Sequence, residues 1–258
     1  MSELNMTGSL PDTVPEVRAI GVPDLREALA RGMQDFNLIP TQLAFLGLLY
    51  PVIGFVAARS ATGYALMPLV FPLLAGLSLM GPVAAVGLYE ISRRREAGEP
   101  VSWQSAFAVL WSPAIGGIVI LACVLLIIFG CWLGVAQAIY NATVGPDVPD
   151  SVGAFTALVL HSPGLIIWGN LAGACFAALV LAISAVSFPM MLDRWCSPVL
   201  AVQTSLRVVA RNPATMAIWG VIVAVLLVVG AIPALIGLAV VMPILGHATW
   251  HLYRRVVA

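Results

Sequence analysis

The stretch ATMAIWGVIVAVLLVVGAIPALIGLAVVMPILGHATWHL, residues 214–252, decides the fold. It is predominantly apolar over 39 residues, whereas one crossing of a bilayer takes about 20 helical residues. It is therefore too long for a single span. Gly230 and Pro233 lie near its middle and predict a break in the helix. We expect two transmembrane helices here, at 214–231 and 233–252.

The composition of the whole chain points the same way. Hydrophobic residues make up 61% of the 258 residues and charged residues only 9%, whereas soluble domains carry about 25% charged residues. Four further apolar segments lie at 41–58, 65–92, 113–138 and 164–191. The sequence therefore predicts an all-α, polytopic membrane protein with six transmembrane helices.

The arginines predict the orientation of these helices. All 12 basic residues are arginine. With six spans and a cytoplasmic N-terminus, every arginine except Arg59 lies on the cytoplasmic side of the membrane. An excess of positive charge is typical of cytoplasmic loops. Six arginines fix the inner ends of the even-numbered helices: Arg93, Arg94, Arg95, Arg194, Arg254 and Arg255. We expect both termini in the cytoplasm, a cytoplasmic N-terminal segment at 1–40 and a transmembrane domain at 41–258. The zero net charge gives no support to nucleic-acid binding.

A threefold repeat is suggested by the segments 22–47, 100–120 and 197–220. Each begins with residues that start helices and then reaches a proline, Pro40, Pro113 or Pro213, before a membrane span. We interpret them as amphipathic helices at the cytoplasmic interface, with contact to a soluble domain as the alternative. Aligning GPVAAVGLYEISRRR with VMPILGHATWHLYRRV places Glu90 opposite His251. The predicted architecture is three units, each an interfacial helix plus a transmembrane hairpin.

The candidate site is a polar cluster at the inner ends of the even-numbered helices, formed by Glu90, Asp193, His247 and His251. Ionisable groups at membrane depth are costly and often functional, which allows an ion or proton site. The alternative is a set of internal ion pairs, Glu90 with Arg93 or Arg94 at helical spacing and Asp193 with Arg194 or Arg207.

Metal, cofactor and catalytic chemistry find little support in the sequence. His247 and His251 are four residues apart, a spacing that metal ligands use, but the chain has only three histidines and no HExxH motif. We therefore expect no metal, no cofactor and no catalytic residues. The two imidazoles are instead expected to bond to neighbouring groups or to lipid headgroups.

Two motifs carry a family resemblance, GPVAAVGLYEISRRREAGEP (81–100) and RVVARNPATMAIWG with VVMPILGHATWHLYRR (207–220 and 240–255). They resemble an uncharacterised bacterial family of integral membrane proteins, a domain of unknown function, of which some members are labelled cytochrome c oxidase subunit I. The resemblance extends over residues 20–258. It implies a bacterial inner-membrane protein without a defined activity, and a respiratory neighbourhood.

These observations predict a protein that is not an enzyme. The first hypothesis is an accessory, assembly or scaffolding subunit of a larger membrane complex, one option being a complex of the respiratory chain. Its partners would be membrane lipids and other membrane-protein subunits. The second hypothesis is a small ion or solute transporter or channel that uses the polar groups at the cytoplasmic helix ends. An enzyme acting on lipids at the interface is a third option, for which no catalytic motif is present.

Overall fold

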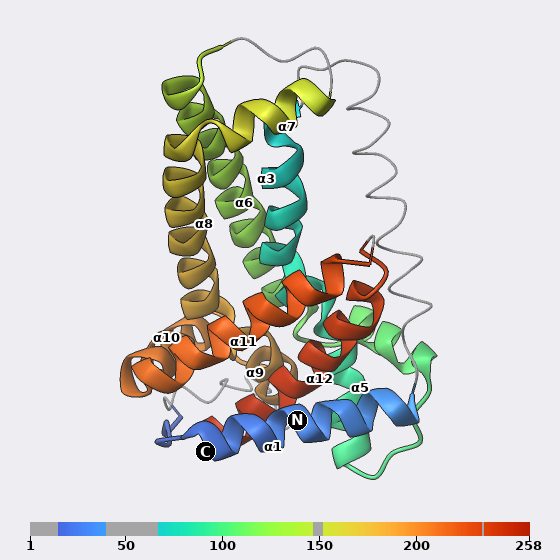
Figure 1. Cartoon of the computed structure of the whole chain (residues 1–258). Helices are drawn as coiled ribbons and strands as arrows, with labels where there is room; N and C mark the ends of the chain where they lie inside the picture. Colours follow the sequence, from blue (N-terminus) through green and yellow to red (C-terminus); the bar gives the residue numbers. More distant parts are fainter. Residues whose placement is uncertain (1–14, 40–66, 147–151, 234) are drawn as a thin grey trace, which may run out of the picture.

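The computed structural model describes residues 15–39, 67–146, 152–233 and 235–258, and every regular element among them is helical (Figure 1). The α-helices and 3-10 helices follow in this order: α1 (Val22–Leu38), α3 (Met67–Leu77), η2 (Ser78–Met80), α4 (Gly81–Ala84), α5 (Val86–Glu96), η3 (Trp103–Trp111), α6 (Ile115–Thr143), α7 (Val152–Leu160), α8 (Pro163–Ser184), α9 (Ser187–Arg194), α10 (Pro198–Arg211), α11 (Pro213–Ala231) and α12 (Leu238–Val256). The predicted all-α class is confirmed.

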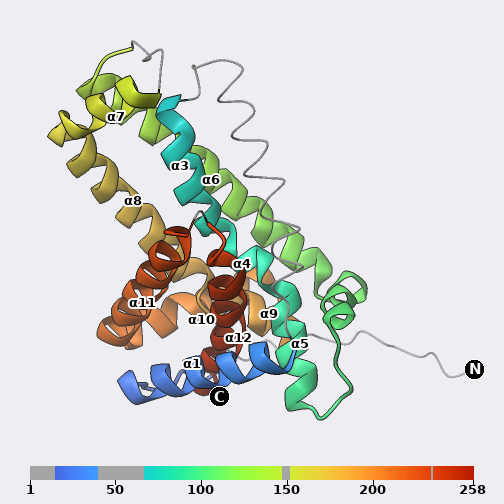
Figure 2. The same ribbon diagram turned by 45° about the vertical axis from the view of Figure 1, so that its right-hand side comes forward.

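The helices form two regions along the length of the molecule. Helices α3, α6 and α8 run side by side, and α7 lies at their far end (Figures 1 and 2). Helices α1, α5, α9, α10 and α12 gather at the opposite end, which we call the α1 end. Helix α11 lies in the same half of the molecule as the α1 end. Both views show that α1 crosses this end beneath α12.

Four helical stretches within the described residues are long and apolar enough to cross a membrane: Pro68–Glu96, Ile115–Thr143, Pro163–Arg194 and Pro213–Ala231. They correspond to the predicted spans at 65–92, 113–138, 164–191 and 214–231. Their surfaces carry many exposed large apolar side chains, as expected for helices that face lipid. The predicted span 41–58 lies outside the described residues.

The predicted span at 233–252 is not confirmed, because α12 is not among the four candidate spans. Its second half contains His247, His251, Arg254 and Arg255, which lower its hydropathy. This half is also buried within the protein, where it packs against α1 and α5. Since its polar residues find partners on those helices, α12 needs no lipid contact over that half. The arrangement of six helices in three units is therefore also not confirmed.

The three helices predicted before the odd-numbered spans are present in part. Helix α1 begins after Gly21, whose N–H donates to the Asp24 carboxylate at 2.9 Å, and Pro23 lies in its first turn. Helix α10 is capped by Ser197, whose Oγ accepts from the Leu200 N–H at 3.3 Å. The middle segment forms the 3-10 helix η3 instead of an α-helix.

The two ends of the described chain meet at the α1 end. Val17 and Val257 form an isolated antiparallel bridge, and the Arg18 N–H donates to the Val256 carbonyl at 2.8 Å. The Asn212 side chain, which lies between α10 and α11, accepts from the Ile20 N–H at 2.9 Å. These bonds hold the segment before α1 against the end of α12 and the start of α11.

Candidate functional site

The site is created by a close crossing of α1 and α12. At Gly32 on α1 an added Cβ would lie 2.6 Å from the Ala248 nitrogen and 2.8 Å from the Ile244 carbonyl oxygen of α12. A residue with a side chain would separate the two helices, so the glycine permits the contact. On its other side, α12 meets α5, where Gly246 packs against Leu88. Side chains from α1, α5 and α12 therefore converge one turn beyond these contacts.

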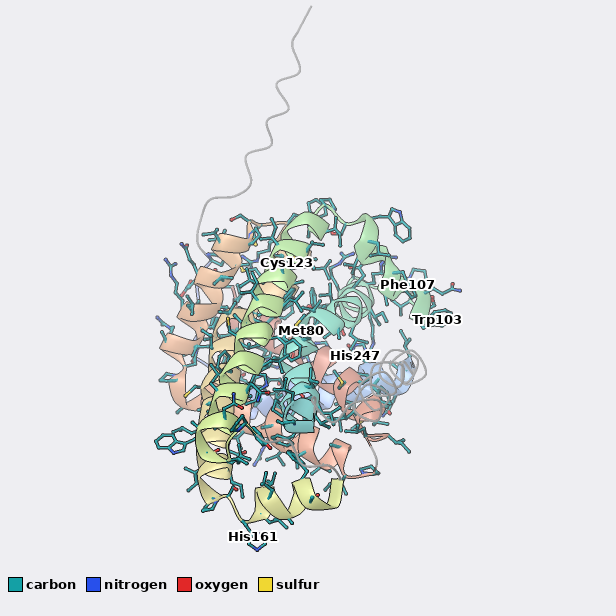
Figure 3. All side chains as sticks on the ribbon, turned by 90° about the horizontal axis from the view of Figure 1, so that it is seen from above. Met80, Trp103, Phe107, Cys123, His161 and His247 are labelled. Carbon is teal, nitrogen blue, oxygen red and sulfur yellow. The ribbon has the colours of Figure 1, made fainter. Side chains whose placement is uncertain are left out.

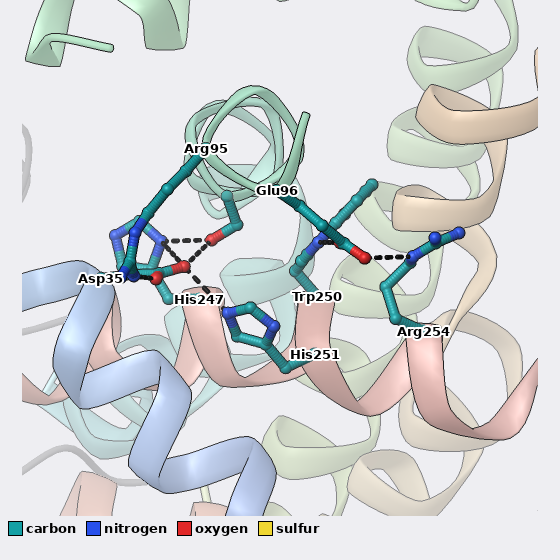
Figure 4. A network of polar contacts seen from close by, with 8 residues as sticks. Asp35, Arg95, Glu96, His247, Trp250, His251 and Arg254 are labelled. Atoms are coloured by element: carbon teal, nitrogen blue, oxygen red, sulfur yellow. Dashed lines mark hydrogen bonds and ion pairs between the residues drawn. The ribbon is translucent and has the colours of Figure 1, made fainter. Parts of the chain in front are cut away.

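Asp35 of α1 lies at the centre of the convergence and is 1% exposed. Its Oδ2 accepts a hydrogen bond from Ser92 Oγ of α5 at 2.5 Å and one from His251 Nε2 of α12 at 2.9 Å (Figure 4). Its Oδ1 forms an ion pair with the Arg95 guanidinium. One carboxylate therefore links three helices, and the adjacent arginine favours its ionised form.

His247 joins the same network through Ser92. The distance from Ser92 Oγ to His247 Nδ1 is 2.8 Å. Because the hydroxyl proton of Ser92 is donated to the Asp35 carboxylate, Nδ1 must supply the proton of this second bond. His247 is thus protonated on Nδ1, and its Nε2 is an acceptor. This Nε2 is buried and has no hydrogen-bond partner among the described residues.

Burial keeps both imidazoles neutral. It lowers the pKa of His247 to about 3, with a further contribution from nearby His251 and Arg95. Burial also lowers the pKa of His251, and the Arg31 charge acts in the same direction. At neutral pH the two histidines of the network therefore act as neutral donors and acceptors.

A polar pocket opens beside the network. Its volume is about 360 Å³, and it is lined by Arg31, Gln34 and Asp35 from α1, by Ser92, Arg95 and Glu96 from α5, and by His251 from α12. Arg31 and Gln34 are exposed at its rim, whereas Asp35 and Ser92 lie buried at its floor. The pocket thus connects the surface of the molecule to the buried carboxylate.

A second network lies further along α12. Glu96 accepts from Trp250 Nε1 at 2.9 Å and from Arg254 Nε at 3.1 Å (Figure 4). Arg254 also contacts Asp193 of α9 at 3.3 Å, and the Tyr253 hydroxyl donates to Asp193 at 2.6 Å. The second network therefore ties α9 and the end of α5 to α12.

The four predicted site residues are separated into three places. His247 and His251 come together around Asp35, whereas Asp193 belongs to the second network. Glu90 is 4% exposed and binds its own helical neighbours, Arg93 at 2.8 and 2.9 Å and Arg94 at 2.6 Å. The predicted pairing of Glu90 with these arginines is present, but the aligned positions Glu90 and His251 have different partners.

The six arginines predicted to set the topology all lie at the α1 end, and each has a partner within the protein. Arg93 and Arg94 bind Glu90, Arg95 binds Asp35, and Arg254 binds Glu96 and Asp193. Arg255 pairs with Asp24 at 3.1 Å and with Glu27. Arg194 donates to the Tyr253 hydroxyl at 3.2 Å and to the Ala258 carbonyl, not to Asp193 as the sequence suggested.

Asp35 and Ser92 were missed from the sequence. A signal for Asp35 was present, because Leu25, Ala28, Gly32 and Asp35 recur at helical spacing and form the buried face of α1. Among the described residues, no group of three or more His, Cys, Asp or Glu side chains is placed to hold a metal ion.

Long apolar helices with a polar network at one end define this molecule as an integral membrane protein with several spans. Residues 70–193 match the model of a family described as "Predicted integral membrane protein (DUF2189)". The match confirms the resemblance to an uncharacterised membrane-protein family. The matched residues include the first motif, 81–100, but not the second, at 207–220 and 240–255. The match is therefore shorter than the expected resemblance over residues 20–258. No curated protein and no solved structure matches the chain.

Proposed function

We propose that this protein is a non-enzymatic subunit with an accessory, assembly or scaffolding role in a larger membrane complex. The observation that carries the proposal is that charged side chains at the α1 end form ion pairs within the protein. They bind one another across α1, α5, α9 and α12, and so hold these helices together. In this proposal the α1 end faces the cytoplasm of a bacterial cell, in keeping with the arginine bias of the sequence.

The remaining surface suits contact with lipids or with other membrane helices. Exposed apolar side chains follow α6, α8 and α11, among them Ile127, Ile167 and Val228, which are 67%, 62% and 64% exposed. Helix η3 adds Trp103 and Phe107, which point away from the other helices (Figure 3). Aromatic residues of this kind are common where a membrane protein meets the lipid headgroups.

The Ser, His and Asp side chains of the network do not have the arrangement of a catalytic triad. In a triad the histidine lies between serine and aspartate and accepts the serine proton. Here Ser92 lies between His247 and Asp35, and its proton is directed to the carboxylate. Ser92 is also 1% exposed. This order of groups favours a non-enzymatic role.

Purification of the full chain from its native membrane in a mild detergent tests the subunit proposal. We expect a stoichiometric membrane-protein partner in native mass spectrometry. A photo-crosslinker at position 127 of α6 should capture that partner, whereas one at His161, in the α7–α8 turn, serves as a comparison. A monodisperse particle without any partner protein would contradict the proposal.

A second function, transport of protons or other small ions, is favoured by one specific observation. The polar pocket reaches the buried Asp35, and hydrogen bonds continue from Asp35 to the buried His247. Buried ionisable groups within membrane proteins commonly belong to ion or proton pathways. Asp35→Asn in reconstituted vesicles should abolish flux. Unchanged flux in this variant would exclude Asp35 from any pathway.

A further inference from the structure

We propose that the protein binds the headgroup of an anionic phospholipid in a second pocket, between the C-terminal end of α10 and the segment before α1. This pocket is separate from the network around Asp35, and the inference goes beyond the subunit role and does not depend on it. The lipid phosphate is assigned to Arg207 and Arg211.

The second pocket has a volume of about 400 Å³, which is within the usual range for a small-ligand site. The Asn212 Nδ2 donates to the Arg18 carbonyl at 3.1 Å, and this hydrogen bond holds the segment before α1 against the end of α10. The two sides of the pocket are therefore kept together by the fold. The lining residues are Pro15, Glu16 and Val17 on one side and Arg207, Ala210 and Arg211 on the other.

The arginines of the second pocket differ from those of the two networks. The network arginines are held by partners within the protein, whereas Arg207 and Arg211 are exposed and form no ion pair within the described part of the chain. Glu16 lines the same pocket, but none of the described ion pairs joins it to either arginine. Two guanidinium groups and one carboxylate leave the pocket with a net positive charge. This charge complements one singly charged phosphodiester.

The exposed face of α10 has an apolar part beside the basic part. Val199 is 66% exposed and Leu206 is 46% exposed, and at a spacing of seven residues they lie along one side of the helix. Arg207 and Arg211 lie next to that side, and the opposite face, which includes Val208, is buried. A helix with this pattern suits the membrane–water interface, with its apolar part toward the acyl chains and its arginines toward the phosphates.

The position of α10 agrees with such a boundary. The helix packs against α8 and α9 at the α1 end (Figure 1), and only Asn212 separates it from α11. Helix α11 is one of the candidate membrane spans, and its Val221, Val225 and Val228 are 61%, 53% and 64% exposed. The second pocket therefore lies where the chain passes from the charged end of the molecule into an apolar helix, which is the level of lipid headgroups.

An anionic phospholipid supplies both kinds of group that this surface requires. Its phosphate oxygens accept the paired hydrogen bonds that guanidinium groups donate, and its acyl chains cover the apolar part of α10. A zwitterionic lipid also carries an ammonium or a trimethylammonium group, which the net positive charge of the pocket disfavours. Basic pockets beside membrane helices bind anionic lipid headgroups in this way.

Native mass spectrometry of the purified full chain in detergent tests the site. The protein is titrated with phosphatidylglycerol, phosphatidylethanolamine and phosphatidylcholine that carry the same acyl chains, and the Kd of the first bound lipid is measured. We expect phosphatidylglycerol to bind more tightly than the two zwitterionic lipids. Arg207→Gln and Arg211→Gln should each weaken its binding about fivefold, and the double variant about 25-fold.

Three controls accompany the titration. Arg26→Gln should leave the Kd unchanged, because Arg26 of α1 is also exposed and without an ion pair among the described residues, but does not line the pocket. Glu16→Gln should strengthen binding of phosphatidylglycerol, because it removes the negative charge. Inorganic phosphate should not displace the lipid, because it has no acyl chains.

Equal Kd values for the three lipids, or an unchanged Kd for phosphatidylglycerol in the double variant, would overturn the site. Displacement by inorganic phosphate would assign the pocket to a free anion and overturn the lipid. A photo-crosslinker in place of Gln203, which is exposed on the same face of α10, should form a lipid adduct in the native membrane. A stoichiometric protein adduct there would overturn the lipid site. Because the lipids are added to purified protein, the Kd values do not depend on whether a partner subunit exists.

Discussion

Replacing Gly32 by alanine should displace α1 from α12 and open the network around Asp35. The added Cβ would lie 2.6 Å from the Ala248 nitrogen, 2.8 Å from the Ala248 Cβ and 2.8 Å from the Ile244 oxygen. These distances are about 1 Å shorter than ordinary contacts. Because two of the three atoms belong to the backbone, α1 has to move as a whole.

The cost of this substitution has two parts. Forcing an extra carbon into a packed contact costs about 1–3 kcal/mol. Moving α1 also lengthens the hydrogen bonds of Asp35, each worth about 1.5–3 kcal/mol when a charged group takes part. We expect the free energy of unfolding to fall by about 3 kcal/mol, or roughly 6–12 °C in Tm at about 2–4 °C per kcal/mol.

Thermal unfolding in detergent and hydrogen exchange of α1 measure the effect. Gly130→Ala is the matched control, since Gly130 lies inside α6 and a Cβ there would meet nothing within 4 Å. Its Tm should not fall, because alanine is the better helix former by about 1 kcal/mol. A Gly32→Ala variant with unchanged Tm and unchanged protection of α1 would refute the proposed contact.

Three further predictions concern the two networks. Asp35→Asn should lower the free energy of unfolding by about 3 kcal/mol, since it weakens the charged hydrogen bonds from Ser92 and His251 and the ion pair with Arg95. Denaturant titration measures the change. A value below about 0.5 kcal/mol, typical of surface substitutions, would contradict the central role of Asp35. Burial lowers the pKa of His247 from 6.5 to about 3 in the folded protein. Between these pH values the unfolded chain therefore binds more protons than the folded protein. The contribution of neutral His247 to the free energy of unfolding should be fully present above pH 6.5 and should fall as the pH drops toward 3. In Tm measurements His247→Gln should reduce this pH dependence and the exposed His161→Gln should not; an unchanged profile in His247→Gln would count against burial as the cause. Tyr253→Phe removes the 2.6 Å hydrogen bond to Asp193 and should lower the free energy of unfolding by about 1–3 kcal/mol. An unfolding midpoint equal to that of the unmodified protein would show that this hydrogen bond contributes nothing to stability.

Much of the helical framework follows from local sequence. The starts of α1 and α10 were recognisable because serine and aspartate accept hydrogen bonds from backbone N–H groups at a helix start, and proline fits the first helical turn. The spans at α6, α8 and α11 were recognisable because a long apolar helix has few stable locations other than a bilayer. These features depend on neighbouring residues only, and the structure places them within a few residues of their predicted limits.

The site depends on contacts between distant residues, and the sequence predicted less of it. Asp35, Ser92 and His251 are separated by 57 and 159 residues. They meet because α12 packs against α1 at Gly32 and against α5 at Gly246. Treating α12 as a sixth span assigned His251 to the membrane boundary. The second half of this helix is covered by α1, where Gly32 permits the close approach. Amphipathicity indicated that α1 has a buried face, but not that this face binds another helix of the same chain.

The most direct test of the central claim, that Asp35 of α1 is bound between Ser92 and His251, is a double-mutant cycle. The free energy of unfolding is measured for the unmodified protein, Asp35→Asn, His251→Gln and the double variant. Groups in direct contact show coupling energies of about 0.5–3 kcal/mol, and a charged hydrogen bond of 2.9 Å predicts a coupling of about 1.5 kcal/mol or more. Strictly additive effects of the two substitutions would contradict the claim.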